Sequence, residues 1–225
     1  RVWFGKRGYM TLNSHLDLVR LLERAVRKAK LPVSFSGGFH PHPRISIAMA
    51  LCLGASSSGE IMDFELTQSM EIDDFKEKLI SVLPTDIPIY MVEEISLKAP
   101  ATSQTLYAAE YILTITTDYE ATPVNWHNWI YMVKTTPEIW WEHTTKSGKN
   151  KLVNLRDRLL ELEVDSTNIS QDNYLSNTIQ LRYLGSCRND GTILNPEQLL
   201  FMLEKAAGRE FQLLHIHRQR LILAV

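Results

Sequence analysis

The segment from residue 33 to residue 50 constrains the local fold more than any other part of this chain. It reads VSFSGGFHPHPRISIAMA, in which Gly37 and Gly38 precede two prolines that alternate with two histidines. The glycines permit a positive φ or a close backbone approach, whereas Pro41 and Pro43 fix φ and favour extended neighbours. We therefore expect a stiff, shaped loop between a helix and a strand.

This loop would present an aromatic ring, two imidazoles and a guanidinium group to its surroundings. The side chains are those of Phe39, His40, His42 and Arg44. Loops that are held by a rigid scaffold commonly carry binding residues. The four side chains, with Gly37 and Gly38, are therefore candidate contacts for a protein or for RNA.

A helix is predicted immediately before the loop, over residues 14–31. Its apolar stripe is expected at helical spacing, at Leu16, Val19, Leu22, Val26 and Ala29. A second group at spacings of three and four is cationic and consists of Arg20, Arg24, Arg27 and Lys28. This basic flank could meet phosphates or an acidic partner, or it could be a solvated face that Glu23 partly neutralises.

The element order predicts an α+β fold. In the first half, strands are expected over residues 1–12, 45–53, 61–66 and 87–97, with a turn over 54–59 and helices over 14–31 and 73–84. This order, β-α-β-β-α-β, is that of a ferredoxin-like domain, in which an antiparallel sheet carries its helices on one face. Residues 98–104 contain proline and small residues, and they form the expected linker.

The second half repeats that order around an inserted hairpin. Strands are expected over residues 108–117, 159–164, 178–184, 211–217 and 221–225, helices from Pro123 and over 195–207, and the hairpin over 138–155. We therefore predict two tandem ferredoxin-like domains, residues 1–98 and residues 107–225. Within the inserted hairpin, Trp140, Trp141 and the tip residue Lys149 are candidate binding residues. Core packing is the alternative role for the tryptophans, and one of the two adjacent rings should stay accessible.

Composition limits the function classes. The net charge of −2 and a pI near 6.4 argue against wholesale electrostatic binding of nucleic acid, although a local basic patch can still bind it. Cys52 and Cys187 are too few for a disulfide framework or a zinc site, so we expect buried thiols in a reducing cytoplasm. No apolar run reaches the roughly 18 residues of a membrane span. The chain starts at Arg1 rather than methionine, which suggests a longer parent polypeptide.

The histidines offer weak grounds for catalysis or metal binding. His15 and Asp17, together with the loop histidines, could form an acid–base cluster for RNA cleavage. The alternative is that Ser14 and Asp17 cap the helix and that His15 packs locally. The pairs His40/His42 and His215/His217 lack supporting ligands, so we expect no metal, no cofactor and no catalytic residue.

Two sequence blocks are similar to a known family. VWFGKRG (residues 2–8) with LNSHLD (residues 12–17), and FSGGFHPHPRIS (residues 35–46), resemble the radical-SAM-linked domain family of unknown function; KSGK (146–149) and VNLR (153–156) resemble its later blocks. The resemblance implies fusion to, or genes beside, radical-SAM proteins, and genes beside ribonuclease E/G. Two cysteines cannot hold a [4Fe–4S] cluster, so the chain is not itself a radical-SAM catalyst.

From this resemblance we expect a non-catalytic regulatory protein of bacterial RNA metabolism that binds a ribonuclease of the E/G type and inhibits it. The alternative is an RNA-binding accessory domain that presents substrate to a radical-SAM RNA-modifying enzyme. Neither role involves a membrane.

Overall fold

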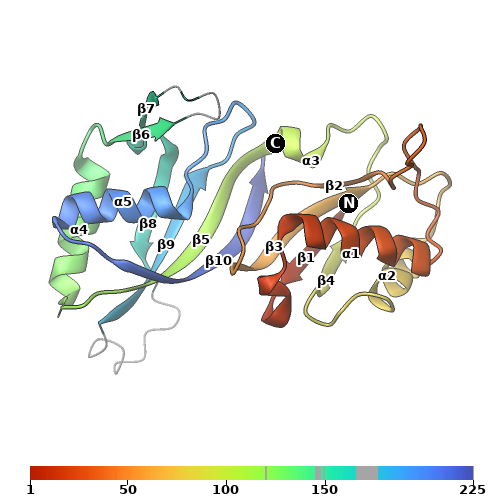
Figure 1. Ribbon diagram of the computed structural model, residues 1–225, viewed down its shortest axis with the longest axis horizontal. Coiled ribbons are helices and arrows are strands. Elements are labelled where there is room, and N and C mark those ends of the chain that lie inside the picture. Colours follow the sequence, from red (N-terminus) through yellow and green to blue (C-terminus); the bar gives the residue numbers. More distant parts are fainter. Residues whose placement is uncertain (120, 145–147, 149, 166–176, 225) are drawn as a thin grey trace. The chain divides into compact units, whose positions relative to one another are not determined.

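The computed structural model describes residues 1–119, 121–144, 148, 150–165 and 177–224. The fold is α+β, as the sequence predicts, and the chain divides into two compact units (Figure 1). Unit 1 comprises residues 1–106 together with 218–225, and unit 2 comprises residues 107–217. Residues 218–225 are predicted to belong to the second half, whereas in the structure they are part of the first unit.

Unit 1 follows the predicted order of strands and helices. Its elements are β1 (Val2–Lys6), the 3-10 helix η1 (Gly8–Leu12), α1 (His15–Lys28), β2 (Ile45–Ile47), β3 (Ser56–Phe64), α2 (Ile72–Ile80), β4 (Ile89–Val92) and α3 (Thr102–Thr105). The strand order is β4-β1-β3-β10, where β10 is Gln212–Leu223, and β2 also pairs with β3. The pairs β1–β3, β1–β4 and β2–β3 are antiparallel.

The core of unit 1 lies between α1, α2 and the strands. Its central members are apolar side chains from all of these elements: Val2, Phe4, Leu18, Leu22, Val26, Met62, Phe75, Leu79 and Ile89. The predicted stripe of α1 is wrong at Leu16, which is 64% exposed, while Leu18 is buried. Residues 18, 22, 25 and 26 share one face at spacings of three and four, whereas Leu16 lies two residues from Leu18 and therefore on the far side of the helix.

Two strand boundaries differ from the prediction for a tertiary reason. The strand predicted over 45–53 ends at Ile47, and β3 begins at Ser56, inside the predicted turn. The Ser57 hydroxyl donates a 2.8 Å hydrogen bond to the Arg218 carbonyl, and a Cβ at Gly59 would lie 2.5 Å from the Arg220 Cα. The small residues that look like a turn signal thus allow close approach of β10.

Unit 2 also follows the predicted order. Its elements are β5 (Leu106–Thr116), α4 (Pro123–Thr135), β6 (Trp140–Thr144), β7 (Asn150–Asn154), the 3-10 helix η2 (Arg156–Arg158), β8 (Leu159–Val164), β9 (Thr178–Ser186), α5 (Pro196–Ala207) and β10 (Gln212–Leu223). The sheet order is β10-β5-β9-β8, and β6 and β7 form a separate two-stranded sheet. Pro123 and Pro196 occupy the first turns of their helices, and Gly208 ends α5 with a φ of +65°.

The two strands predicted at the end of the chain are one continuous strand, β10. The polar run HRQR at 217–220 reads as a break in the sequence, but Arg218 is buried and forms an ion pair with Glu60 on β3. The prediction of two buried thiols is wrong for Cys52, which is exposed because it lies in the turn before β3; Cys187 is buried. Among the described helices, none is long and apolar enough to span a membrane.

Candidate interaction surface

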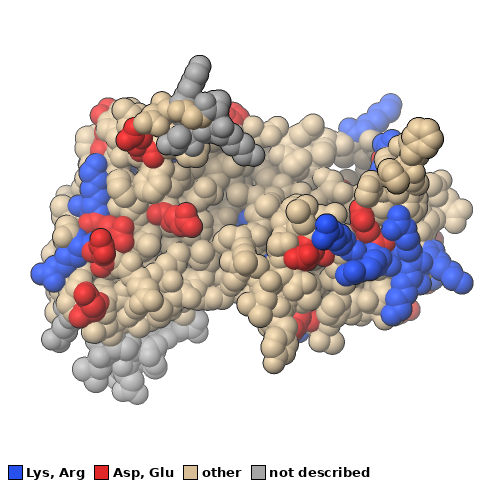
Figure 2. Space-filling model, viewed as in Figure 1, with Lys and Arg blue, Asp and Glu red and all other residues tan. Residues whose placement is uncertain are grey.

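The predicted basic flank of α1 faces solvent. Arg20, Arg24, Arg27 and Lys28 are all exposed, and Figure 2 shows Lys and Arg side chains gathered over α1. The Arg20 guanidinium lies 3.9 Å from the Asp17 carboxylate. Within the described part of the chain, Arg24 and Lys28 make no ion pair. We call these four cations the basic face.

The segment after α1 folds back on itself as a short hairpin, the 34–44 flap. The Ser36 amide donates to the His42 carbonyl at 2.8 Å, and the Arg44 amide donates to the Ser34 carbonyl at 2.7 Å. The root of the flap extends the edge of β3, because the Ser34 amide donates to the Glu65 carbonyl at 2.7 Å. The shaped loop predicted from the sequence is therefore a hydrogen-bonded flap.

The flap tip, residues 37–41, is fully exposed. Gly38 adopts a φ of +103°, a conformation that side-chain-bearing residues avoid. Phe39 projects with no burial at all, and His40 beside it is also exposed. The tip therefore presents an exposed aromatic ring on a hydrogen-bonded hairpin.

The flap is attached to the carboxyl-terminal half of α1. His42 Nδ1 lies 2.9 Å from Glu23 Oε1, the Arg27 guanidinium donates to the Pro41 carbonyl at 3.5 Å, and it sits 5.3 Å from the centre of the Phe35 ring. Glu23 therefore joins α1 to the flap, and its carboxylate still lies three residues from Arg20 and four from Arg27 on the helix. The cations and the flap tip belong to one surface.

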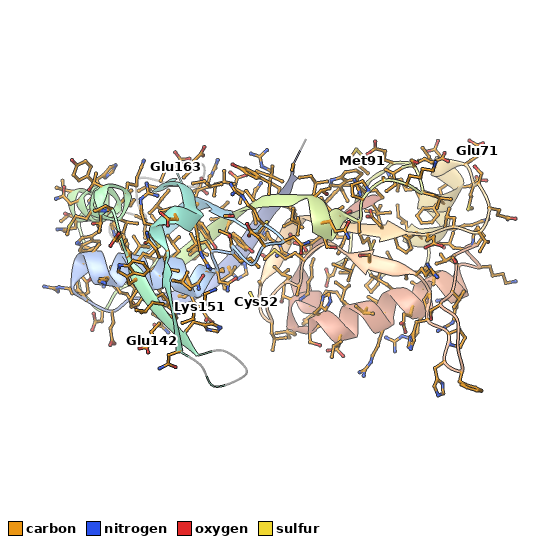
Figure 3. The ribbon with its side chains drawn as sticks, turned by 90° about the horizontal axis from the view of Figure 1, so that it is seen from above. Cys52, Glu71, Met91, Glu142, Lys151 and Glu163 are labelled. Carbon is orange, nitrogen blue, oxygen red and sulfur yellow. The ribbon has the colours of Figure 1, made fainter. Side chains whose placement is uncertain are left out.

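Exposed apolar side chains form a patch at the amino-terminal end of α1, and the sequence did not predict it. Its members are exposed large side chains: Tyr9 (86%), Leu12 (70%), Leu16 (64%) and Leu53 (66%). The Gly54 amide donates to the Thr11 carbonyl at 2.9 Å, which joins the turn before β3 to η1. Cys52, labelled in Figure 3, lies in the same turn. The sequence assigns Leu16 to the core and Leu53 to a strand, so periodicity alone could not reveal this patch.

Buried charges hold the patch in place. Arg218 Nε donates to Glu60 Oε1 at 2.7 Å, and its other nitrogens donate to the carbonyls of Met49 and Ala50, each at 3.1 Å. The Lys6 ammonium donates to the Asn13 carbonyl at 2.7 Å, and burial lowers the pKa of Lys6. These cations tie down the backbone that carries Leu12 and Leu53.

The structure does not bring His15 and Asp17 together with the loop histidines as an acid–base cluster. Ser14 and Asp17 form a capping box, and hydrogen bonds from Ser14 lower the pKa of the Asp17 carboxyl. Glu23, the partner of His42, lies eight residues after His15, which is about 12 Å along the helix axis. Arg44 instead pairs with Glu65 at 3.2 Å. In the described ranges, no three His, Cys, Asp or Glu side chains converge as metal ligands.

The other predicted site residues, Trp140, Trp141 and Lys149, belong to unit 2, whereas the surface on α1 belongs to unit 1. Trp140 is 46% exposed and donates from Nε1 to Glu138 at 3.1 Å, whereas Trp141 packs edge-to-face on Phe201 with ring centres 4.6 Å apart. One of the two rings is thus accessible, as expected. Lys149 lies outside the described residues.

A cavity of about 380 Å³ lies elsewhere in unit 1, beside α2 and the end of β4. Phe64, Leu66, Phe75 and Val92 contribute to its largely apolar lining. None of the predicted site residues lines this cavity.

Solved structures share the fold at low sequence identity. A chain of a Cbf5-Nop10-Gar1 complex matches with a TM-score of 0.56 and 12% identity, over 97% of this chain and 48% of that chain. An H/ACA RNP bound to a substrate RNA containing 2'-deoxyuridine matches with a TM-score of 0.48 and 10% identity, over 93% and 44% of the two chains. An archaeal box H/ACA sRNP Nop10-Cbf5 complex matches with a TM-score of 0.48 and 9% identity, over 97% and 47%.

The chain therefore spans about half the length of the chains that it resembles. No curated protein matches it. A family model does match, over residues 1–196. The chain belongs to the family of uncharacterized proteins conserved in bacteria known as DUF2344.

Proposed function

We propose that this chain is a non-catalytic interaction protein that binds a protein partner through the α1 surface, which comprises the basic face, the 34–44 flap and the apolar patch. The observation that carries the proposal is the set of exposed leucines beside the cations, Leu12, Leu16 and Leu53. RNA is bound through phosphate contacts and base stacking, for which aliphatic side chains are poorly suited. Contiguous exposed apolar patches instead mark sites of protein association.

The proposed setting is bacterial RNA metabolism, and the proposed partner is a ribonuclease of the E/G type. This partner is implied by the resemblance to radical-SAM-linked domains. The likeness in fold to a chain of the Cbf5-Nop10-Gar1 complex supports only the RNA-related setting. Binding would inhibit the ribonuclease by masking its surface or its substrate path. The proposed compartment is the cytoplasm.

The proposed architecture of each unit is ferredoxin-like. Both units have two helices within a β-α-β-β-α-β order, with the β6–β7 hairpin inserted in the second. The last strand lies next to the first in unit 2, and β4 lies next to β1 in unit 1. In each unit the third strand lies on the other side of the first. This strand order supports the proposed ferredoxin-like architecture.

Affinity capture tests the proposed function. The tagged protein is incubated with native bacterial lysate, with and without ribonuclease A, and captured proteins are identified by mass spectrometry. Retention of an E/G-type ribonuclease after RNA digestion, together with slower RNA cleavage by that enzyme in the presence of the purified chain, is the expected result. Loss of every captured protein after digestion would contradict the proposal.

RNA binding is the second candidate, because four exposed cations stand beside an exposed ring at Phe39. In this case the chain presents RNA to a radical-SAM RNA-modifying enzyme. Arg20→Glu with Arg24→Glu should then weaken binding of a fluorescent RNA and flatten its dependence on salt concentration. An unchanged affinity and an unchanged salt slope would exclude the basic face from RNA binding.

A further inference from the structure

We infer that the α1 surface recognises an acidic segment of its protein partner that carries apolar side chains at both ends. The inference rests on the proposed protein-binding function and specifies the chemistry of the bound segment. It follows from the order of side chains along α1: the apolar patch, then the basic face, then the exposed ring of the flap.

The centre of the surface requires negative charge. Arg20, Arg24 and Arg27 follow one another at spacings of four and three, so they project from one side of α1 over about 10 Å. The two nearby carboxylates do not balance this charge, because Asp17, 3.9 Å from Arg20, and Glu23, bonded to His42, stand against the four cations of the basic face. Carboxylates of a partner would therefore meet an excess of positive charge, and guanidinium groups bind carboxylates in bidentate geometry.

Both ends of the surface require apolar groups. Leu16 at the first turn of α1 and Arg27 near its last turn are eleven residues apart, which is about 16 Å along the axis. Leu12 is four residues before Leu16, the Gly54 amide joins the turn of Leu53 to Thr11, and Arg27 donates to Pro41 in the flap tip that carries Phe39. A segment that reaches both ends needs about eleven residues as a helix or about five as a strand.

The surface is also organised before binding. The capping box holds the start of α1, hydrogen bonds close the flap, and Arg218 and Lys6 fix the backbone beneath the leucines. Preformed surfaces lose less conformational entropy when they bind. The geometry therefore favours a defined linear segment over a diffuse polyanion.

Fluorescence anisotropy with synthetic probes tests the inference directly. The probes are a 14-residue peptide with two leucines at each end and glutamates between them, the same peptide with serine ends, the same peptide with glutamines in place of glutamates, and an oligouridylate of equal charge. We expect the first peptide to bind at least tenfold more tightly than each of the other three. Leu12→Ser with Leu53→Ser should weaken its binding, and adding Phe39→Ser should reduce the affinity to that of the serine-ended peptide.

Matched controls lie outside the surface in the same unit. Leu97→Ser removes an equally exposed leucine and Lys78→Glu reverses an exposed charge on α2, and neither should change affinity. Binding of the serine-ended peptide and the oligouridylate as tightly as the first peptide would overturn the inference in favour of polyanion binding. Because the probe comparison uses the unaltered protein, it does not depend on the folding of any variant.

Affinity capture separates the failure of this inference from the failure of the proposed function. If a protein partner survives ribonuclease treatment and is captured equally by the Leu12→Ser/Leu53→Ser protein and the Phe39→Ser protein, the function stands and the inference is wrong. If the unaltered chain captures no protein after RNA removal, the proposed function itself fails. Reduced capture by these variants, with normal capture by Leu97→Ser, supports both.

Discussion

Arg218 shows how one buried charge can organise a unit. Its guanidinium bonds with the Glu60 carboxylate and with the carbonyls of Met49 and Ala50, so it connects β10, β3 and the turn between β2 and β3. Removing one member of a buried pair leaves the other charge without its partner, and that is more costly than replacing both.

Arg218→Ala should therefore lower the free energy of unfolding by about 3–5 kcal/mol, as measured by urea denaturation. Gln219→Ala, whose exposed side chain lies on the opposite face of the same strand, should change it by less than about 0.5 kcal/mol. Combining Arg218→Met with Glu60→Leu should recover much of the loss. Equal effects of Arg218→Ala and Gln219→Ala would show that the pair does not stabilise unit 1.

The two cysteines differ in exposure, which supplies a test that needs no substitution. Cys52 is exposed in the apolar patch region, whereas Cys187 is only 3% exposed. Iodoacetamide should modify Cys52 in the native protein and reach Cys187 only after denaturation, as followed by mass spectrometry of tryptic peptides. Binding of a partner on the α1 surface should slow the modification of Cys52; faster modification of Cys187 would contradict the burial described here.

At the scale of elements, α1 has to be held at both ends for its surface to work. Its start is a capping box, in which the Asp17 amide donates to the Ser14 hydroxyl at 3.2 Å and the Ser14 amide donates to the Asp17 carboxylate at 3.1 Å. Its later turns carry Glu23 and Arg27, which bind the flap. Changes at the cap and at the flap should therefore have different consequences.

Ser14→Ala should destabilise the protein by about 1 kcal/mol at neutral pH, because it removes the cap of α1. The lowered pKa of Asp17 means that its ionised form stabilises the fold at pH values above its pKa in the unfolded chain, and that this stabilisation is lost as the pH falls through the folded pKa. Thermal unfolding of both proteins from pH 7 to pH 2 should therefore show a difference that shrinks in acid. A difference that grows in acid would contradict the assigned hydrogen bonds.

The flap tip should matter for binding and not for stability. Phe39 makes no buried contact, so Phe39→Ser should leave the free energy of unfolding within about 0.5 kcal/mol of its original value. Capture of the protein partner should nevertheless fall, because the ring forms one end of the α1 surface. A large drop in melting temperature would show that the ring is packed in solution.

At the scale of the whole molecule, the chain does not divide at a single point. The last strand contributes residues 212–217 to unit 2 and residues from 218 onward to unit 1. Arg218, which pairs with Glu60 of unit 1, therefore comes from the opposite end of the chain. Cutting at the predicted linker separates these partners.

A fragment of residues 1–106 should consequently lack the cooperative unfolding transition that its residues show in the full chain, as measured by near-ultraviolet circular dichroism during urea titration. The fragment keeps the helices and the strands β1 to β4, but it lacks the strand next to β3 and leaves the Glu60 carboxylate without Arg218. Adding Glu60→Leu to the fragment should restore part of the transition. An unaltered fragment as stable as the full chain would show that residues 218–225 are dispensable.

Local sequence signals predicted the elements that depend on near neighbours. Ser14 with Asp17, Pro123, Pro196 and Gly208 mark helix ends in the structure as they do in the sequence, because caps and proline act within a single turn. The exposure of the basic face and the shape of the flap followed from helical spacing and from the glycines and prolines of residues 37–43. The sequence by itself thus determined the order of elements and half of the candidate surface.

Tertiary structure decided the rest. Ser57 and Gly59 lie in a strand because the backbone of β10, whose Arg218 is 161 residues from Ser57, needs small neighbours there. Arg218 can be buried because it forms an ion pair with Glu60. The leucines of the apolar patch are exposed because no described residue covers them. These outcomes depend on contacts between distant residues, which local periodicity and turn chemistry do not encode.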